Sequence, residues 1–287
     1  PVWCPGGRLN ITTSCLDRWL ESPDSASRPA LIAELEDGST RCLTYAQLAT
    51  DVGRCANALR DLELGLGDRV GLYMPMTVEI VVALLALARI GAVVLPLFSG
   101  FGAGAVAQRL ADAGAKGLIT ADGFSRKGTH VPLKSVADEA LTKIASVETV
   151  LVVRHAGVTV DMLTGRDHWW HDVVPQASPD AAPADTAAED PLMIIYTSGP
   201  TGPPKGAVHT HCGFPVKAAQ DMCFGTDVHP GDRVYWVTDM GWMMGPWLIF
   251  GAALLGATAL VYEGAPDWPG PDRLWAMAQR HRLTQMG

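Results

Sequence analysis

The chain has 287 residues, of which 48% are hydrophobic and 18% charged, a composition typical of a globular protein with a sizeable core. Its net charge of −8 argues against general attraction to nucleic acid or to an anionic membrane. The six cysteines show no C-x-x-C spacing and no dense disulfide pattern. Together with the lack of a signal-peptide pattern at the N-terminus, this predicts free thiols and a cytoplasmic location.

Helical and strand patterns alternate along the first half of the chain. Helices are expected at 44–59, 78–90, 104–113 and 133–144. Apolar strands are expected at 69–74, 92–97, 117–120 and 147–153. Thr77 is a candidate N-cap for the second helix, and Gly91 is expected to end it. Strands separated by helices of this length predict an α/β fold with a mostly parallel sheet and helices on its faces.

Residues 175–190 differ in composition from the rest of the chain. They are rich in Pro, Ala and acidic residues and have no apolar period, which predicts a surface linker. We therefore expect a first α/β subdomain at 1–174, the linker, and the beginning of a second α/β subdomain at 191–287.

An uncharged run from Met240 to Tyr262 is long enough to span a bilayer. Several glycines and a proline interrupt it, however. A buried helix at 246–255, ended by Gly256 and followed by a buried strand at 257–262, explains the run without lipid. We therefore expect no membrane span.

A buried strand at 192–196 leads into a loop that combines glycines, hydroxyl side chains and a lysine. Such a loop can hold a polyphosphate, because glycines let backbone N–H groups approach it and lysine supplies a compact cation. An ordinary surface turn is the alternative, since Gly, Pro and Ser dominate turns. The common P-loop is excluded because Pro203 follows Gly202 where that motif requires lysine. The candidate phosphate-binding residues are Thr197, Ser198, Gly199, Thr201, Gly202, Lys205 and Gly206.

The segment YTSGPTGPPKG at 196–206 resembles the signature loop of the adenylate-forming enzymes, which include acyl-CoA synthetases, luciferases and peptide-synthetase adenylation domains. Segments 3–10 (WCPGGRLN), 67–76 (GDRVGLYMPM) and 263–269 (EGAPDWP) are similar to the acetyl-CoA synthetase branch. The resemblance covers nearly the whole chain. It implies the N-terminal part of the adenylate-forming synthetase fold, with the second subdomain incomplete.

The resemblance also implies a reaction that uses ATP, Mg²⁺ and CoA. A carboxylate attacks the α-phosphate of ATP to give an acyl-adenylate and pyrophosphate, and the thiol of CoA then displaces AMP. The loop would hold the β- and γ-phosphates, with Lys205 stabilising their charge. Pro200 and Pro203 stand where the family usually has Ser or Thr and frequently Lys, respectively. Loss of two donors would weaken phosphate binding by ~1–3 kcal/mol if both were used.

Trp242, Met243 and Met244 match residues that line the acyl site in the family. In acetate-using relatives the positions of the two methionines usually hold Val and Thr. Two flexible thioethers make this wall more apolar and adaptable, which predicts a short- to medium-chain acid other than acetate. The alternative is that both methionines fill the core.

Gly100 and Arg126 match residues that meet the nucleotide of CoA in the family, and Lys127 is a possible substitute for a second arginine. An ordinary solvated basic pair is the alternative for Arg126 and Lys127. No metal ligand is expected within the chain. His209 and His211 share one face of an extended stretch, but no third zinc ligand is near them in sequence.

The family's adenine-binding segment, acidic metal ligand, hinge and catalytic C-terminal lysine lie beyond the segments matched here. We therefore expect an acyl-CoA synthetase in which a C-terminal domain is the partner of this chain, and expect the chain to be inactive alone. The alternatives are a catalytically incomplete module with an interaction or regulatory role, and an adenylating enzyme that delivers to a carrier protein.

Overall fold

Two sheets form the framework of the computed structural model, which describes residues 2–197 and 204–287. In spatial order, the larger sheet contains β11 (Lys205–Thr210), β10 (Pro191–Thr197), β4 (Val93–Pro96), β3 (Arg69–Tyr73), β5 (Gly117–Ala121), β8 (Thr149–Val153) and β9 (Asp167–Trp169). The smaller sheet contains β14 (Gln285–Met286), β12 (Arg233–Tyr235), β13 (Thr258–Glu263), β1 (Pro29–Leu35) and β2 (Thr40–Thr44). A separate hairpin consists of β6 (Phe124–Arg126) and β7 (Thr129–Val131).

Neighbouring strands in the two sheets are parallel except at one edge of each, where β11 and β2 run antiparallel to their neighbours. The helices are α1 (Ile11–Cys15), α2 (Pro23–Ser27), α3 (Tyr45–Asp61), α4 (Val78–Arg89), α5 (Ala103–Ala113), α6 (Leu133–Leu141), α7 (Trp170–Val173), α8 (Phe214–Gln220), α9 (Met244–Leu255) and α10 (Arg273–His281). The predicted α/β fold with mostly parallel sheets is confirmed.

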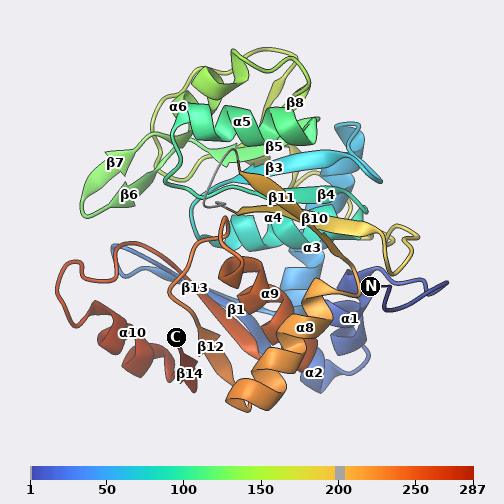
Figure 1. The fold of residues 1–287 in the computed structure, drawn as a ribbon. Helices are drawn as coiled ribbons and strands as arrows, with labels where there is room; N and C mark the ends of the chain where they lie inside the picture. The colour runs from blue at the N-terminus through green and yellow to red at the C-terminus, as the bar shows by residue number, and fades with distance from the viewer. Residues whose placement is uncertain (1, 198–203) are drawn as a thin grey trace.

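Helices cover the sheets in layers (Figure 1). Helices α3 and α4 lie between the two sheets, whereas α5 and α6 cover the other face of the larger sheet. In the smaller sheet, side chains of β1 alternate between two cores, as the period of a strand requires. Leu31 and Ala33 belong to the main core, whereas Ile32 packs in a second cluster with Met277 of α10.

Sequence signals explain where several helices begin and end. The Thr44 hydroxyl accepts from the Gln47 N–H, and the Gln47 side chain accepts from the Thr44 N–H, which makes a capping box for α3. Gly91 and Gly256 follow α4 and α9 with φ values of 73° and 71°, the left-handed conformation that ends helices.

The start of α4 corrects one prediction. Thr77 precedes the helix as expected, but its side chain makes no cap hydrogen bond, so the prediction of a hydroxyl cap is wrong. Glu79 in the first turn instead places negative charge at this positive end of the helix dipole.

The uncharged run forms α9 and β13, close to the predicted helix and strand. In the part of the chain that the structure describes, no helix is long and apolar enough to cross a membrane.

The 175–190 segment connects α7 to β10, and it does not coincide with a boundary between the sheets. Each sheet combines strands from both sides of the segment, because parallel pairing brings β1 beside β13 and β4 beside β10. The segment also lies against α3, where a Cβ at Gly53 would be 1.8 Å from the Pro179 carbonyl oxygen. This close approach explains a glycine inside a long helix.

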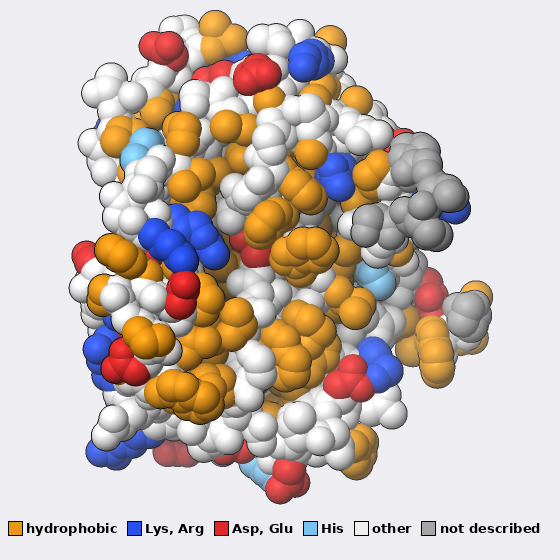
Figure 2. Space-filling model, turned by 60° about the vertical axis from the view of Figure 1, so that its left-hand side comes forward, with side chains coloured by type: hydrophobic (Ala, Val, Ile, Leu, Met, Phe, Trp, Pro, Cys, Tyr) orange, Lys and Arg blue, Asp and Glu red, His pale blue; other side chains and the backbone are white. Residues whose placement is uncertain are grey.

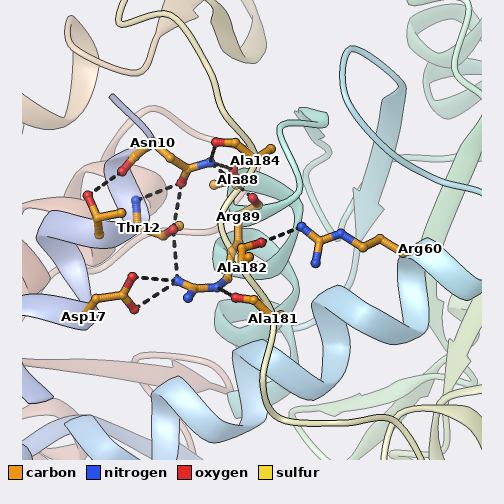
Figure 3. A network of polar contacts seen from close by, with 10 residues as sticks. Asn10, Thr12, Asp17, Arg60, Ala88, Arg89, Ala181, Ala182 and Ala184 are labelled. Carbon is orange, nitrogen blue, oxygen red and sulfur yellow. Dashed lines mark hydrogen bonds and ion pairs between the residues drawn. The ribbon is translucent and has the colours of Figure 1, made fainter. Parts of the chain in front are cut away.

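Side chains of the helices bind the backbone of this segment (Figure 3). Arg60 donates to the carbonyl of Ala182 at 2.6 Å, and Arg89 donates to that of Ala181 at 2.6 Å while pairing with Asp17. Asn10 donates at 3.0, 3.1 and 3.3 Å to the carbonyls of Ala88, Arg89 and Ala184. The segment therefore belongs to the packed structure although its composition is that of a linker.

Replacing Asn10 by Ala is expected to destabilise the fold by about 2–3 kcal/mol, because it removes the amide that donates to three carbonyl groups and the side-chain oxygen that caps the Thr12 N–H of α1. Asn57 provides a matched control, since its amide donates to two carbonyls of the same segment through solvent-exposed hydrogen bonds. Asn57→Ala should cost less than about 1 kcal/mol. Urea unfolding of both variants measures the difference, and equal losses would contradict the importance of the buried amide.

Candidate functional site

A cavity of about 420 Å³ opens where the two sheets meet. Its lining comes from segments that follow β3 and β4 of the larger sheet, from β12 and β13 of the smaller sheet with the segments that follow them, and from β6. The segments after β3, β4, β12 and β13 leave the carboxyl ends of parallel strands, which is where ligands bind in open α/β sheets. Figure 2 shows one face of the molecule on which hydrophobic side chains gather, with a group of basic side chains beside them.

A buried carboxylate joins the two sheets at this cavity. Asp239, which is 8% exposed, accepts from the Ser99 hydroxyl at 2.6 Å and from the Gly241 N–H at 2.8 Å. Burial raises the pKa of Asp239, and hydrogen bonds from Ser99 and Gly241 and the charge of Arg126 oppose that rise. Because Ser99 and Asp239 both line the cavity, their hydrogen bond sets the distance between two of its walls.

Gly241 allows the two walls to approach each other. A Cβ at this position would lie 2.0 Å from the Phe98 nitrogen and 2.4 Å from the Phe98 Cα. Both are backbone atoms, which a side-chain rotation cannot move away. Only glycine fits here, for reasons of space.

The structure brings two of the three predicted acyl-site residues to the cavity. Trp242 and Met244 are part of its lining, and the Trp242 ring packs on Phe98 with centroids 5.6 Å apart. Met243 is 55% exposed and is not among the lining residues. The alternative is that both methionines fill the core. It does not hold for Met243, because that side chain is exposed.

The residues predicted to bind CoA lie around the same cavity. Arg126 lines it, and Gly100 directly follows Ser99 in an exposed turn. The ammonium group of Lys127 lies 2.7 Å from a carboxylate oxygen of Asp267. Arg126 is therefore the predicted cation that the structure places at the cavity, whereas Lys127 is engaged in an exposed ion pair beside it.

The predicted phosphate loop is described only at its two ends. Thr197 pairs with Lys205 in the antiparallel ladder of β10 and β11, and Gly206 pairs with Tyr196. Thr197, Lys205 and Gly206 are exposed. Because β10 runs parallel to β4, the carboxyl end of β10 at Thr197 lies on the same side of the sheet as the segment that carries Ser99 after β4. The other predicted loop residues, Ser198, Gly199, Thr201 and Gly202, lie outside the described residues, as do Pro200 and Pro203.

Sequence reasoning missed the polar residues that shape the cavity. Ser99, Asp239 and Glu263 line it, and Glu263 lies 3.6 Å from the His155 ring. Burial lowers the pKa of His155, but the hydrogen bond and charge of Glu263 outweigh it, so the pKa is raised. Asp239 and Glu263 left a recognisable signal, since they are the acidic residues directly before and directly after the long uncharged run.

The histidines considered for zinc have other environments. His211 is buried, and its Nδ1 accepts a hydrogen bond from the Ile11 N–H at 3.3 Å. Burial lowers the pKa of His211 to about 4, so the ring is neutral and belongs to the core. Within residues 2–197 and 204–287, no group of three or more His, Cys, Asp or Glu residues could hold a metal ion.

The sequence matches the family described as AMP-binding enzyme over residues 21–287, and the chain belongs to this family. It is 46% identical over 290 residues to an acetyl-coenzyme A synthetase of Gemmatimonas aurantiaca and 44% identical over 287 residues to that of Salmonella typhimurium. Each match covers 98% of this chain and 44% of the relative. The chain therefore spans less than half the length of these curated relatives.

A solved structure of an acetoacetyl-CoA synthetase from Streptomyces lividans has the same fold. The TM-score is 0.92 at 31% sequence identity, and the match covers 100% of this chain and 43% of the other. The predicted membership in the adenylate-forming family, with similarity to acetyl-CoA synthetases, is thus confirmed.

Replacing Gly241 by Ala is expected to separate the two walls of the cavity, because the new methyl group would overlap the backbone of Phe98. We expect a loss of about 3 kcal/mol in the free energy of unfolding, at the upper end for a single overpacked site. Gly104→Ala in α5 is the control, since a Cβ there meets no atom within 4 Å and alanine favours helix. A Gly241→Ala protein as stable as the Gly104→Ala protein would refute the close approach.

Proposed function

We propose that this chain provides the acyl- and CoA-binding part of an AMP-forming acyl-CoA synthetase. The observation that carries the proposal is the cavity between the sheets, which combines an apolar wall with one basic side chain. Trp242 and Met244 supply the apolar wall, and Arg126 supplies the positive charge. Membership in the AMP-binding enzyme family supports the same activity.

In this proposal the substrates are a carboxylic acid, ATP with Mg²⁺, and CoA. The carboxylate attacks the α-phosphate, so a carbon–oxygen–phosphorus linkage forms while pyrophosphate leaves. The CoA thiol then attacks the acyl carbon, and AMP leaves as the thioester forms. Neither step requires a nucleophile from the protein, so catalysis depends on positioning and on stabilising charge.

The residues of the chain divide these tasks among themselves. Thr197, Lys205 and Gly206, with Ser198, Gly199, Thr201 and Gly202 of the same loop, bind the phosphates of ATP. Lys205 stabilises the negative charge that passes to pyrophosphate. Its exposed position at the start of β11 leaves its ammonium group accessible to a ligand.

The CoA nucleotide lies near Gly100 and Arg126, with Lys127 adding positive charge nearby. A C-terminal domain provides the remaining groups, in keeping with the share of the relatives that the chain covers. The wall at Trp242 and Met244 selects a short- to medium-chain acid other than acetate.

Carboxylate-dependent exchange between ATP and labelled pyrophosphate tests the first step. We expect exchange with the protein that contains this chain together with its C-terminal domain, and none with residues 1–287 alone. Formation of a thioester with free CoA distinguishes this function from delivery to a carrier protein. A folded protein with both domains that binds ATP but gives no exchange with any acid would support a non-catalytic module instead.

Replacing Met244 by Ala is expected to shift the preferred acid toward longer chains, because the smaller side chain enlarges the cavity. The shift in relative kcat/KM should be about tenfold for each methylene that the added space accommodates. Met243→Ala is the matched control and should leave the preference unchanged, since Met243 is exposed and does not line the cavity. A panel of straight-chain acids measures both variants, and acetate as the fastest substrate of the wild type would defeat the proposed specificity.

A further inference from the structure

The β6–β7 hairpin carries Arg126 to the cavity, and its turn has an unusual composition. Arg126 pairs with Thr129, so the turn consists of Lys127 and Gly128, with φ values of 50° and 70°. Two positive φ values define the type I′ turn that suits the twist of a hairpin. Glycine adopts this conformation readily, whereas a residue such as lysine resists it. The turn therefore depends on contacts that hold Lys127 in place.

Glu36 provides those contacts from the end of β1. Its carboxylate accepts from the Lys127 N–H at 2.8 Å through one oxygen and from the Gly128 N–H at 3.0 Å through the other. The first oxygen also accepts from the Ala265 N–H at 3.2 Å. Successive N–H groups in such a conformation form a concave anion site. Glu36 is 9% exposed, so these are buried, charge-assisted hydrogen bonds.

One carboxylate thus joins three segments around Arg126. Glu36 follows β1, the hairpin turn follows Arg126, and Ala265 follows β13. The segment before Ala265 includes Gly264, which lines the cavity and whose carbonyl accepts from Arg126 at 3.5 Å. Glu36 therefore holds both the hairpin turn and the segment at Ala265. The guanidinium group of Arg126 lies between these two segments.

The other attachment of the turn is weaker. Lys127 pairs with Asp267 at 2.7 Å, but the two side chains are 52% and 59% exposed. An exposed ion pair of this kind contributes little to stability because water and salt screen it. The buried carboxylate of Glu36, and not the outer ion pair, is therefore the contact on which the turn depends.

We propose that Glu36 is a positioning residue for the CoA site: it holds the Lys127–Gly128 turn so that Arg126 faces the phosphate of the CoA nucleotide. This inference rests on the proposed function, in which Arg126 binds that phosphate. Glu36 does not touch the ligand, and the N–H groups that surround it reduce its repulsion of a bound phosphate.

Calorimetric titration of CoA into the 287-residue chain tests the role of Glu36. Arg126→Ala sets the benchmark, with an expected loss in affinity of about tenfold. Glu36→Ala should give a similar loss, and Glu36→Gln a smaller one because it keeps one acceptor oxygen. Asp267→Asn is the matched control on the outer side of the same turn and should change the affinity by less than about twofold.

A double variant separates positioning from a general structural effect. If Glu36 acts through Arg126, then Glu36→Ala added to Arg126→Ala should cause less than about a further twofold loss. If the loss of CoA affinity in the double variant equals the product of the losses in the two single variants, the two residues act independently and the proposal is overturned. Wild-type affinity in Glu36→Ala, or in Glu36→Gln should the alanine variant not fold, would also overturn it. A wild-type chain that binds no CoA would instead overturn the proposed CoA site itself, and the inference with it.

Discussion

The hydrogen bond between Ser99 and Asp239 directly connects the two sheets at the cavity. The two residues are 140 positions apart and follow strands of different sheets. A carboxylate buried in this way costs free energy unless its oxygens are satisfied. Here the Ser99 hydroxyl and the Gly241 N–H satisfy them at 2.6 and 2.8 Å. This contact and the lack of a side chain at Gly241 set the separation of the cavity walls, so the proposed acyl and CoA sites depend on it.

The helices between the sheets give this contact a rigid base. Helix α4 is buried on nearly every side, and Arg89 at its end binds both Asp17 and the 175–190 segment. That segment is acidic and rich in proline, yet Ala181 and Ala188 within it are buried. Polar side chains from the helix layer donate hydrogen bonds to its carbonyl groups. These bonds replace the backbone hydrogen bonds that a helix or a strand would provide.

The sequence predicted the local structure well, because local structure depends on local signals. The apolar periodicity of the helices and strands and the glycines after α4 and α9 lie within a few residues of the features they determine. The pairing of β1 with β13 and the contact of Ser99 with Asp239 depend on residues far apart in the chain, and one sequence contains no signal for such pairs. Met243 is exposed whereas the adjacent Met244 lines the cavity. This difference depends on the rotation of α9 about its axis, which is set by packing against neighbouring elements.

The charges around the cavity are compatible with the proposed anionic ligand although acidic residues line it. Asp239 and Glu263 are the acidic residues among its described lining, and Arg126 is the basic one. Both carboxylates already accept hydrogen bonds from protein groups: Asp239 from Ser99, and Glu263 from the Ser125 N–H at 3.2 Å. Glu36, behind the hairpin, accepts from backbone N–H groups in the same way. These donors offset much of the negative field, whereas the guanidinium of Arg126 has only a long contact of 3.5 Å to Gly264 in the described structure. Its remaining donors are the strongest polar groups that the cavity offers, so the orientation of this one side chain is decisive for the proposed binding of the CoA phosphate.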